Sequence, residues 1–241
     1  MNEDVVAQLA PSGTLRAGIN MSNFLLVTGS TPSGDPDGVS PDMAREIASR
    51  LGVPVALVPY ASPGELVDAA DTGAWNIGLV GAEPAREKLT TFTAAYAEIQ
   101  ATYIVAEGSS VQSVDEVDRP GMRIIVRDRS AYGLYLRRTI KNAELILTDS
   151  FDAARDRFVD EKLDALAGLR SGLMTDLESM SGPRLLEGGF TTVQQAVGTS
   201  RENTAAIAYL RDFVEEVKAN GFVAQLIERH NARGLTVAPP G

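Results

Sequence analysis

Arg86 stands where a short apolar segment leads into a Pro-containing turn, in the stretch GAWNIGLVGAEPAR. Residues 76–80 form a hydrophobic run ending at Gly81, which is typical of a strand buried on both faces of a parallel sheet. Such a sheet binds ligands beyond the carboxyl ends of its strands. The forked donors of arginine match a carboxylate or phosphate bidentately. Arg86 is therefore the candidate anion-binding residue; the alternative is a surface pair with Glu83 or Glu87.

Composition limits the classes of function. The 241 residues are 44% hydrophobic and 22% charged, with 22 Lys and Arg against 32 Asp and Glu, a net charge of -10. This balance argues against a nucleic-acid partner. There is no cysteine and only one histidine, His230, so thiolate chemistry and a histidine-rich metal centre are excluded, and no metal or cofactor is expected.

The termini and apolar runs give no membrane signal. The first residues, MNEDVVAQLAPSGT, carry two acids and no basic segment, so we expect no secretory signal in this chain. Apolar runs such as residues 24–27 are far shorter than the roughly 20 residues that span a bilayer. No direct membrane insertion is expected.

Alternating strand and helix patterns predict an α/β protein with parallel sheets flanked by helices. Helices are expected to begin at Ser40, Ser62, Ser130, Asp149 or Ser150, and Ser200, with a last helix over residues 222–231. Strands are expected at 15–19, 53–58, 76–80, 101–106, 122–126, 144–148, 163–168 and 192–197.

Two capping boxes are predicted, Ser62 with Glu65 and Ser113 with Glu116. Asp35 and Asp37 lie in a Gly- and Pro-rich loop without the spacing of an EF-hand, which favours turn chemistry over calcium binding. The sequence lacks GxGxxG, Walker, HExxH and GxSxG motifs, so it carries no catalytic signature and we name no catalytic residue.

The β-type segments 101–106 and 192–197 are the two plausible passages between two α/β units. We therefore expect two lobes joined by a two-strand hinge: residues 1–102 plus 196–241 as lobe 1, and residues 103–195 as lobe 2. A ligand cleft is expected between such lobes.

Several segments in their order resemble the bacterial extracellular solute-binding proteins of family 3, the type 2 periplasmic binding proteins of amino-acid ABC transporters. They are TLRAGIN, SPDMAREIASRLGVPVALVPY, GAWNIGLVGAEPAREKLTTFTAAY, GMRIIVRDRSAYGLYL, KLDALAGL, QQAVGTSREN and NGFVAQLIERH. The resemblance covers the chain from Leu15 to about His230. It implies a two-lobe architecture, closure about a hinge, and a monomer that delivers a small carboxylate ligand to a transporter permease.

The resemblance also implies ligand contacts. The arginine of the family's PxR turn binds the ligand's α-carboxylate, and Arg86 matches it. Ser130 and Ala131 match the loop that donates from a helix N-terminus. Asn23 and Phe24 match the loop whose aromatic residue covers the ligand.

Departures from the family pattern concern the ligand's ammonium group. Leu169 stands where the family's acid is expected, and Asp164 matches a structural aspartate. Glu98 is a candidate to bind the ammonium group in place of that acid. The alternative is that Glu98 is a solvated residue. In VGAEPAR, Gly81 and Ala82 can offer only backbone groups. An organic or keto acid is thus as plausible a ligand as an amino acid.

The resulting hypothesis is a solute-binding protein that captures a carboxylate by lobe closure. The alternatives are a dehydratase of the prephenate or arogenate type, which resembles this family and would need a carboxylate such as Glu83 or Glu98 as general acid, and a cytoplasmic ligand sensor. The resemblance implies a periplasmic location, whereas a chain that starts natively at Met1 would be cytoplasmic.

Overall fold

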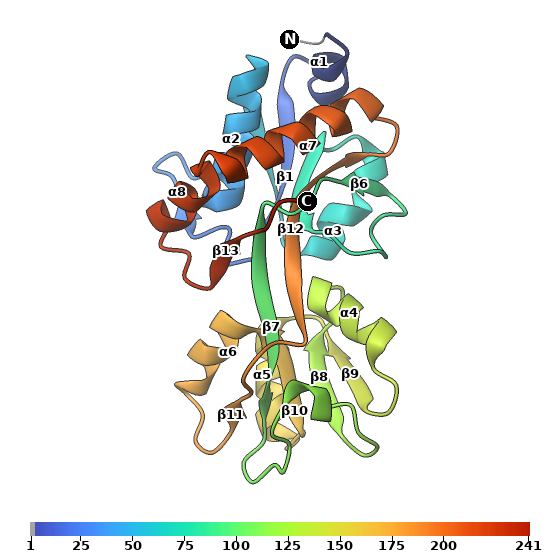
Figure 1. Ribbon diagram of the computed structural model, residues 1–241, viewed down its shortest axis with the longest axis vertical. Coiled ribbons are helices and arrows are strands. Elements are labelled where there is room, and N and C mark those ends of the chain that lie inside the picture. The colour runs from blue at the N-terminus through green and yellow to red at the C-terminus, as the bar shows by residue number, and fades with distance from the viewer. Residues whose placement is uncertain (1–2) are drawn as a thin grey trace. The chain divides into compact units, whose positions relative to one another are not determined.

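The computed structural model describes residues 3–241, and the chain divides into two compact units (Figure 1). Unit 1 comprises Met1–Glu98 and Gln194–Gly241, and unit 2 comprises Ile99–Val193. The chain passes between the units within two strands, β7 (Ala97–Val105) and β12 (Thr191–Ser200). The lobe boundaries expected from the sequence fall inside these same two strands.

The sheet of unit 1 is centred on β1 (Leu15–Asn20). This strand lies between β4 (Val55–Tyr60) and β5 (Ile77–Gly81) and is parallel to both. β12 pairs antiparallel with β5, and β6 (Thr90–Phe92) pairs antiparallel with β12. Every residue of β5 is buried, as its continuous apolar sequence predicts for a central strand.

Helices cover this sheet. α1 (Glu3–Leu9) packs on α7 (Thr204–Ala219), and α8 (Phe222–Arg229) packs on α2 (Val39–Leu51), as Figure 1 shows. α3 (Pro63–Asp68) and the 3-10 turn Ala70–Thr72 pack with Trp75, whose indole Nε1 donates to the carbonyl of Leu66. Trp75 is therefore a packing residue. The remaining strands are the hairpin β2 (Gly29–Ser30) and β3 (Pro36–Asp37), and β13 (Leu235–Val237) beside β7.

Unit 2 repeats the arrangement around β8 (Arg123–Arg127). β8 is parallel to β9 (Glu144–Thr148) on one side and to β10 (Ala165–Leu169) on the other. β7 pairs antiparallel with both β10 and β11 (Arg184–Leu185). The helices are α4 (Ala131–Thr139), α5 (Phe151–Asp160) and α6 (Arg170–Leu177), with a 3-10 turn at Val114–Glu116.

The predicted α/β fold class is confirmed, and three of the predicted caps are present. The hydroxyls of Ser62, Ser130 and Ser150 accept from the backbone N–H three residues on, in α3, α4 and α5. Two predicted caps are wrong. α2 begins after Gly38, and Ser40 instead bonds to the Tyr96 hydroxyl.

The second wrong cap is Ser200, which ends β12; α7 begins after Asn203. The predicted box at Ser113 is also absent, because Ser113 makes no side-chain cap and Glu116 accepts from the Gln112 N–H. A cap requires a backbone that enters a helix at that residue, and strand pairing extends to Ser200, which lies opposite Thr90. Asp35 shapes its turn as expected, since its N–H and C=O bond to Thr31.

The short elements α1, α6 and β13 were not predicted. Each is eight residues or fewer, and such segments depend on tertiary packing more than on their own periodicity. Over residues 3–241, no helix has both the length and the apolarity needed to cross a membrane.

Candidate functional site

The candidate residues other than Glu98, which is on β7, fall on two corners, one in each unit. The unit 1 corner comprises residues 20–27 and 81–90, which follow the carboxyl ends of the parallel strands β1 and β5. Arg86 lies in the turn after β5, where its N–H bonds to the Glu83 carbonyl and its own carbonyl accepts from Leu89 and Thr90. The segment after β5 is thus a series of tight turns and not a full helix.

The Arg86 side chain is only 4% exposed and donates from Nη1 to the Gly81 carbonyl. A buried guanidinium must be compensated by acceptors because desolvating its charge is costly. Arg86 is therefore held at the strand end by its own turn, and the alternative of a solvated surface pair does not describe it.

Asn23 and Phe24 have different roles in the loop after β1. Asn23 is buried; its Oδ1 accepts from the Leu25 N–H, and its carbonyl accepts from the N–H groups of Leu26 and Val27. Phe24 is 45% exposed. Asn23 therefore shapes the loop, whereas the Phe24 ring remains exposed.

The backbone groups predicted at the end of β5 are partly used within the fold. Gly81 O accepts from Arg86, and the N–H of Ala82 donates to the Gln194 carbonyl at 2.7 Å. Gln195 lies opposite Gly81 in the β5–β12 register. Glu98 accepts from the Gln194 amide at 2.8 Å, which ties its carboxylate to β12.

The unit 2 corner comprises residues 127–133, between β8 and α4. Ser130 is buried; its hydroxyl donates to the Arg127 carbonyl at 2.8 Å and accepts from the Gly133 N–H at 3.0 Å. A Cβ on Gly133 would come within 2.4 Å of the Arg127 carbonyl, so glycine allows this close approach. The loop is compact, and Ala131 begins the helix beside it.

The end of β10 carries no acid toward this corner. Leu169 is buried, and the next residue, Arg170, donates to the carbonyls of Leu186 and Gly188. Asp164 accepts from the backbone N–H and Nε of Arg123, at 2.8 and 3.2 Å, which is a structural role as expected.

The sequence pattern of the bacterial extracellular solute-binding proteins, family 3, matches residues 15–232. The chain belongs to this family. A cyclohexadienyl dehydratase from Pseudomonas aeruginosa is 24% identical over 187 residues, which cover 76% of this chain and 68% of that protein. The family and its structural neighbours are mainly binding proteins. Membership implies a small-molecule ligand and an ABC transporter partner.

Solved structures agree on the two-lobe fold. A binding component of an ABC transporter from Wolinella succinogenes, complexed with lysine, has a TM-score of 0.74 at 21% identity and covers 90% of this chain and 95% of its own. An ancestral amino acid-binding protein, described as a precursor of cyclohexadienyl dehydratase, has a TM-score of 0.73 at 18% identity, with 93% and 97% covered. The two-lobe type 2 architecture expected from the resemblance is confirmed.

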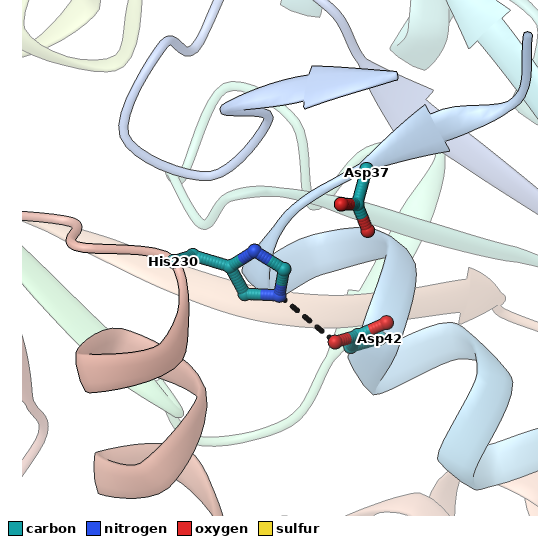
Figure 2. Close-up of side chains that lie close together, drawn as sticks. All are labelled: Asp37, Asp42 and His230. Carbon is teal, nitrogen blue, oxygen red and sulfur yellow. Dashed lines mark hydrogen bonds and ion pairs between the residues drawn. The ribbon is translucent and has the colours of Figure 1, made fainter. Parts of the chain in front are cut away.

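A separate cluster of charged side chains lies on unit 1 of this solute-binding protein. Figure 2 shows His230, at the end of α8, directed at Asp42 on α2, with Asp37 of β3 beside them. The ligand atoms of these three residues lie within 4.8 Å of one another, close enough to hold a metal ion. However, Arg45 and Arg229 contact the same carboxylates, so two cations already balance the two acids.

Asp42 is the centre of this network. It accepts from His230 Nε2 and Arg45 at 2.8 Å and from Arg229 at 3.3 Å. Burial alone would raise the pKa of Asp42, but the hydrogen bonds from His230 and Arg45 outweigh it and lower that pKa below its ordinary value. The His230 side chain is only 8% exposed.

Three polar residues in or beside the two corners are not among the site residues predicted from the sequence: Tyr132, Arg127 and Gln195. All three are buried. The signal for Arg127 was available: a charged residue ending an apolar strand, three residues before a predicted helix cap.

We expect Ser130→Ala to destabilise the protein by about 1 kcal/mol because α4 loses its cap. At this chain length that corresponds to roughly 2 to 4 °C in Tm, measured by circular dichroism. Ser113→Ala is the matched control, since Ser113 caps nothing with its side chain. Equal effects of the two substitutions would contradict the role of Ser130.

Asp42→Asn should lower unfolding free energy by about 1 to 3 kcal/mol at neutral pH, because hydrogen bonds to a charged group are lost. The native pKa of Asp42 is lowered, so the charged form stabilises the fold above the ordinary pKa of 3.8, and this contribution is lost as pH falls through the native pKa. The difference between wild type and variant in urea titrations should shrink in that acid range.

Asp37→Asn is the control for Asp42→Asn. Asp37 is more exposed, and its nearest cationic group is 3.7 Å away. A variant difference at Asp42 that stays constant down to pH 3, or an Asp37 effect of equal size, would contradict this account.

Proposed function

We propose that this solute-binding protein captures a small carboxylate-bearing ligand, an amino acid or an organic acid, and acts as a monomer that closes its lobes around it. The buried guanidinium of Arg86 at the carboxyl end of β5 is the observation that carries this proposal. It is held by backbone at the strand end where ligands of α/β sheets bind.

The remaining contacts follow from the two corners. Ser130 and Ala131 place the first N–H groups of α4 at the carboxyl end of β8, where the helix dipole favours an anion. Phe24 supplies exposed aromatic surface beside Asn23. Gly81, Ala82 and Glu98 stay candidate contacts, although hydrogen bonds within unit 1 already engage part of each residue.

Capture of an amino acid is supported by similar solved structures, one with lysine bound and one with arginine bound. Leu169 offers no negative charge to an α-ammonium group. The proposal therefore includes organic acids on an equal footing with amino acids. Binding favours the closed population, and the closed form is what an ABC permease would recognise.

Wild type and Arg86→Gln should differ sharply in a thermal-shift screen of amino acids, keto acids and dicarboxylates. A ligand at about 100 times its dissociation constant adds about 2.7 kcal/mol to stability, which is roughly 5 to 10 °C for this chain length. We expect the shift to be lost in Arg86→Gln and kept in Arg233→Gln, which changes an exposed arginine. Unchanged affinity in a folded Arg86→Gln variant would overturn the assignment.

A dehydratase activity is the second candidate, because the relative from Pseudomonas aeruginosa is named as one. A general acid would have to come from a carboxylate such as Glu83 or Glu98. The Glu98 carboxylate already accepts a hydrogen bond from the Gln194 amide.

We expect no phenylpyruvate when the protein is incubated with prephenate, as followed by ultraviolet absorbance against a buffer blank. Turnover that exceeds the blank and is lost in Glu83→Gln would replace the binding proposal with an enzymatic one. Thermal stabilisation by prephenate without turnover would agree with binding.

A further inference from the structure

The strand end that holds Arg86 also carries a buried acceptor that the carboxylate-binding proposal does not use. Gln195 of β12 is only 2% exposed, and within residues 3–241 its side-chain Oε1 accepts no hydrogen bond. Gln195 belongs to unit 1, as do Gly81 and Arg86. An acceptor that is removed from water and left unpaired is costly, so this oxygen needs a donor.

Strand pairing places Gln195 beside Gly81. The two residues face each other in the antiparallel β5–β12 register, and in the adjacent pair the Ala82 N–H donates to the Gln194 carbonyl. Because hydrogen-bonded and non-hydrogen-bonded pairs alternate, Gly81 and Gln195 form a non-hydrogen-bonded pair, in which side chains approach most closely. Gly81 has no side chain, which leaves room for the Gln195 carboxamide over the end of β5.

Gly81 also connects this acceptor to the candidate anion-binding residue. Its carbonyl accepts from Arg86 Nη1, so the guanidinium and the Gln195 side chain are both held at the same residue of β5. A carboxylate that pairs with this guanidinium brings its α-carbon to the same strand end. The substituent on that carbon is therefore the part of the ligand nearest to Gln195.

Backbone donors around Gln195 are used within unit 1. The Ala82 N–H is engaged in strand pairing, and the Tyr96 N–H donates to the main-chain carbonyl of Gln195 at 2.8 Å. The Val197 N–H donates to the Thr93 hydroxyl at 3.2 Å. A donor for the Gln195 side chain is thus to be sought in the ligand.

We propose that the Gln195 side-chain oxygen accepts a hydrogen bond from the group on the ligand's α-carbon, so that the ligand is an α-amino or α-hydroxy acid. An ammonium and a hydroxyl group both donate, and a neutral carboxamide accepts from either. A keto oxygen only accepts, so an α-keto acid would bring two acceptors face to face. This inference rests on the proposed function, in which Arg86 binds the carboxylate.

Calorimetric titration with matched ligand sets tests this. Each set has one side chain, that of alanine, leucine, glutamate or arginine, and comprises the L-amino acid, the L-2-hydroxy acid and the acid unsubstituted at C2. The 2-oxo acid is added for alanine, leucine and glutamate. In the set that binds, wild type should favour the amino or hydroxy acid about tenfold or more, because a buried hydrogen-bonding group rejects an analogue that leaves it unpaired.

Gln195→Leu should reduce that preference to about twofold and leave the affinity for the unsubstituted acid unchanged. The apo variant should keep or gain thermal stability, since replacing an unpartnered buried acceptor with an apolar group of similar size is neutral or stabilising. Gln225→Leu changes an exposed glutamine of α8 and is the matched control that keeps the preference. If Gln195→Leu does not fold, Gln195→Met decides the matter.

Equal affinities within the set that binds, tighter binding of the 2-oxo acid, or a preference that Gln195→Leu and Gln195→Met both keep would overturn the inference and leave the Arg86 assignment intact. Affinities unaffected by Arg86→Gln, or no binding of any probe, would overturn the proposed function and this inference with it.

Discussion

Burial of the Arg86 guanidinium is the constraint on which the unit 1 corner depends. A cation removed from water must be surrounded by acceptors, and the Gly81 carbonyl at the end of β5 supplies one. The turn that follows β5 brings the Arg86 side chain back to the end of β5. Rigidity of this kind lowers the entropy lost when a ligand binds.

The unit 2 corner is built by the same means with different chemistry. The Ser130 hydroxyl closes the loop by bonding to Arg127 and Gly133, and it thereby places α4 at the end of β8. Arg127 contributes a positive charge to this corner, and Tyr132 contributes a hydroxyl group.

Two strands carry the chain between the units. β7 carries Glu98, and β12 carries Gln194, at the points where the chain leaves and re-enters unit 1. Their side chains are hydrogen-bonded to each other at 2.8 Å. The pair therefore ties the two strands together at the boundary of unit 1.

Local sequence determined the α/β class, the order of most strands and helices, the corner at Arg86 and the Ser130 cap, because each depends on periodicity or on residues a few positions apart. Only the tertiary structure decided which distant groups meet. Ser40 bonds to Tyr96 and not to its own helix, and His230 reaches Asp42 across 188 residues of chain. Tyr132 is left with an unpartnered hydroxyl near Arg127 because packing, not local pattern, selects the neighbours of a buried side chain.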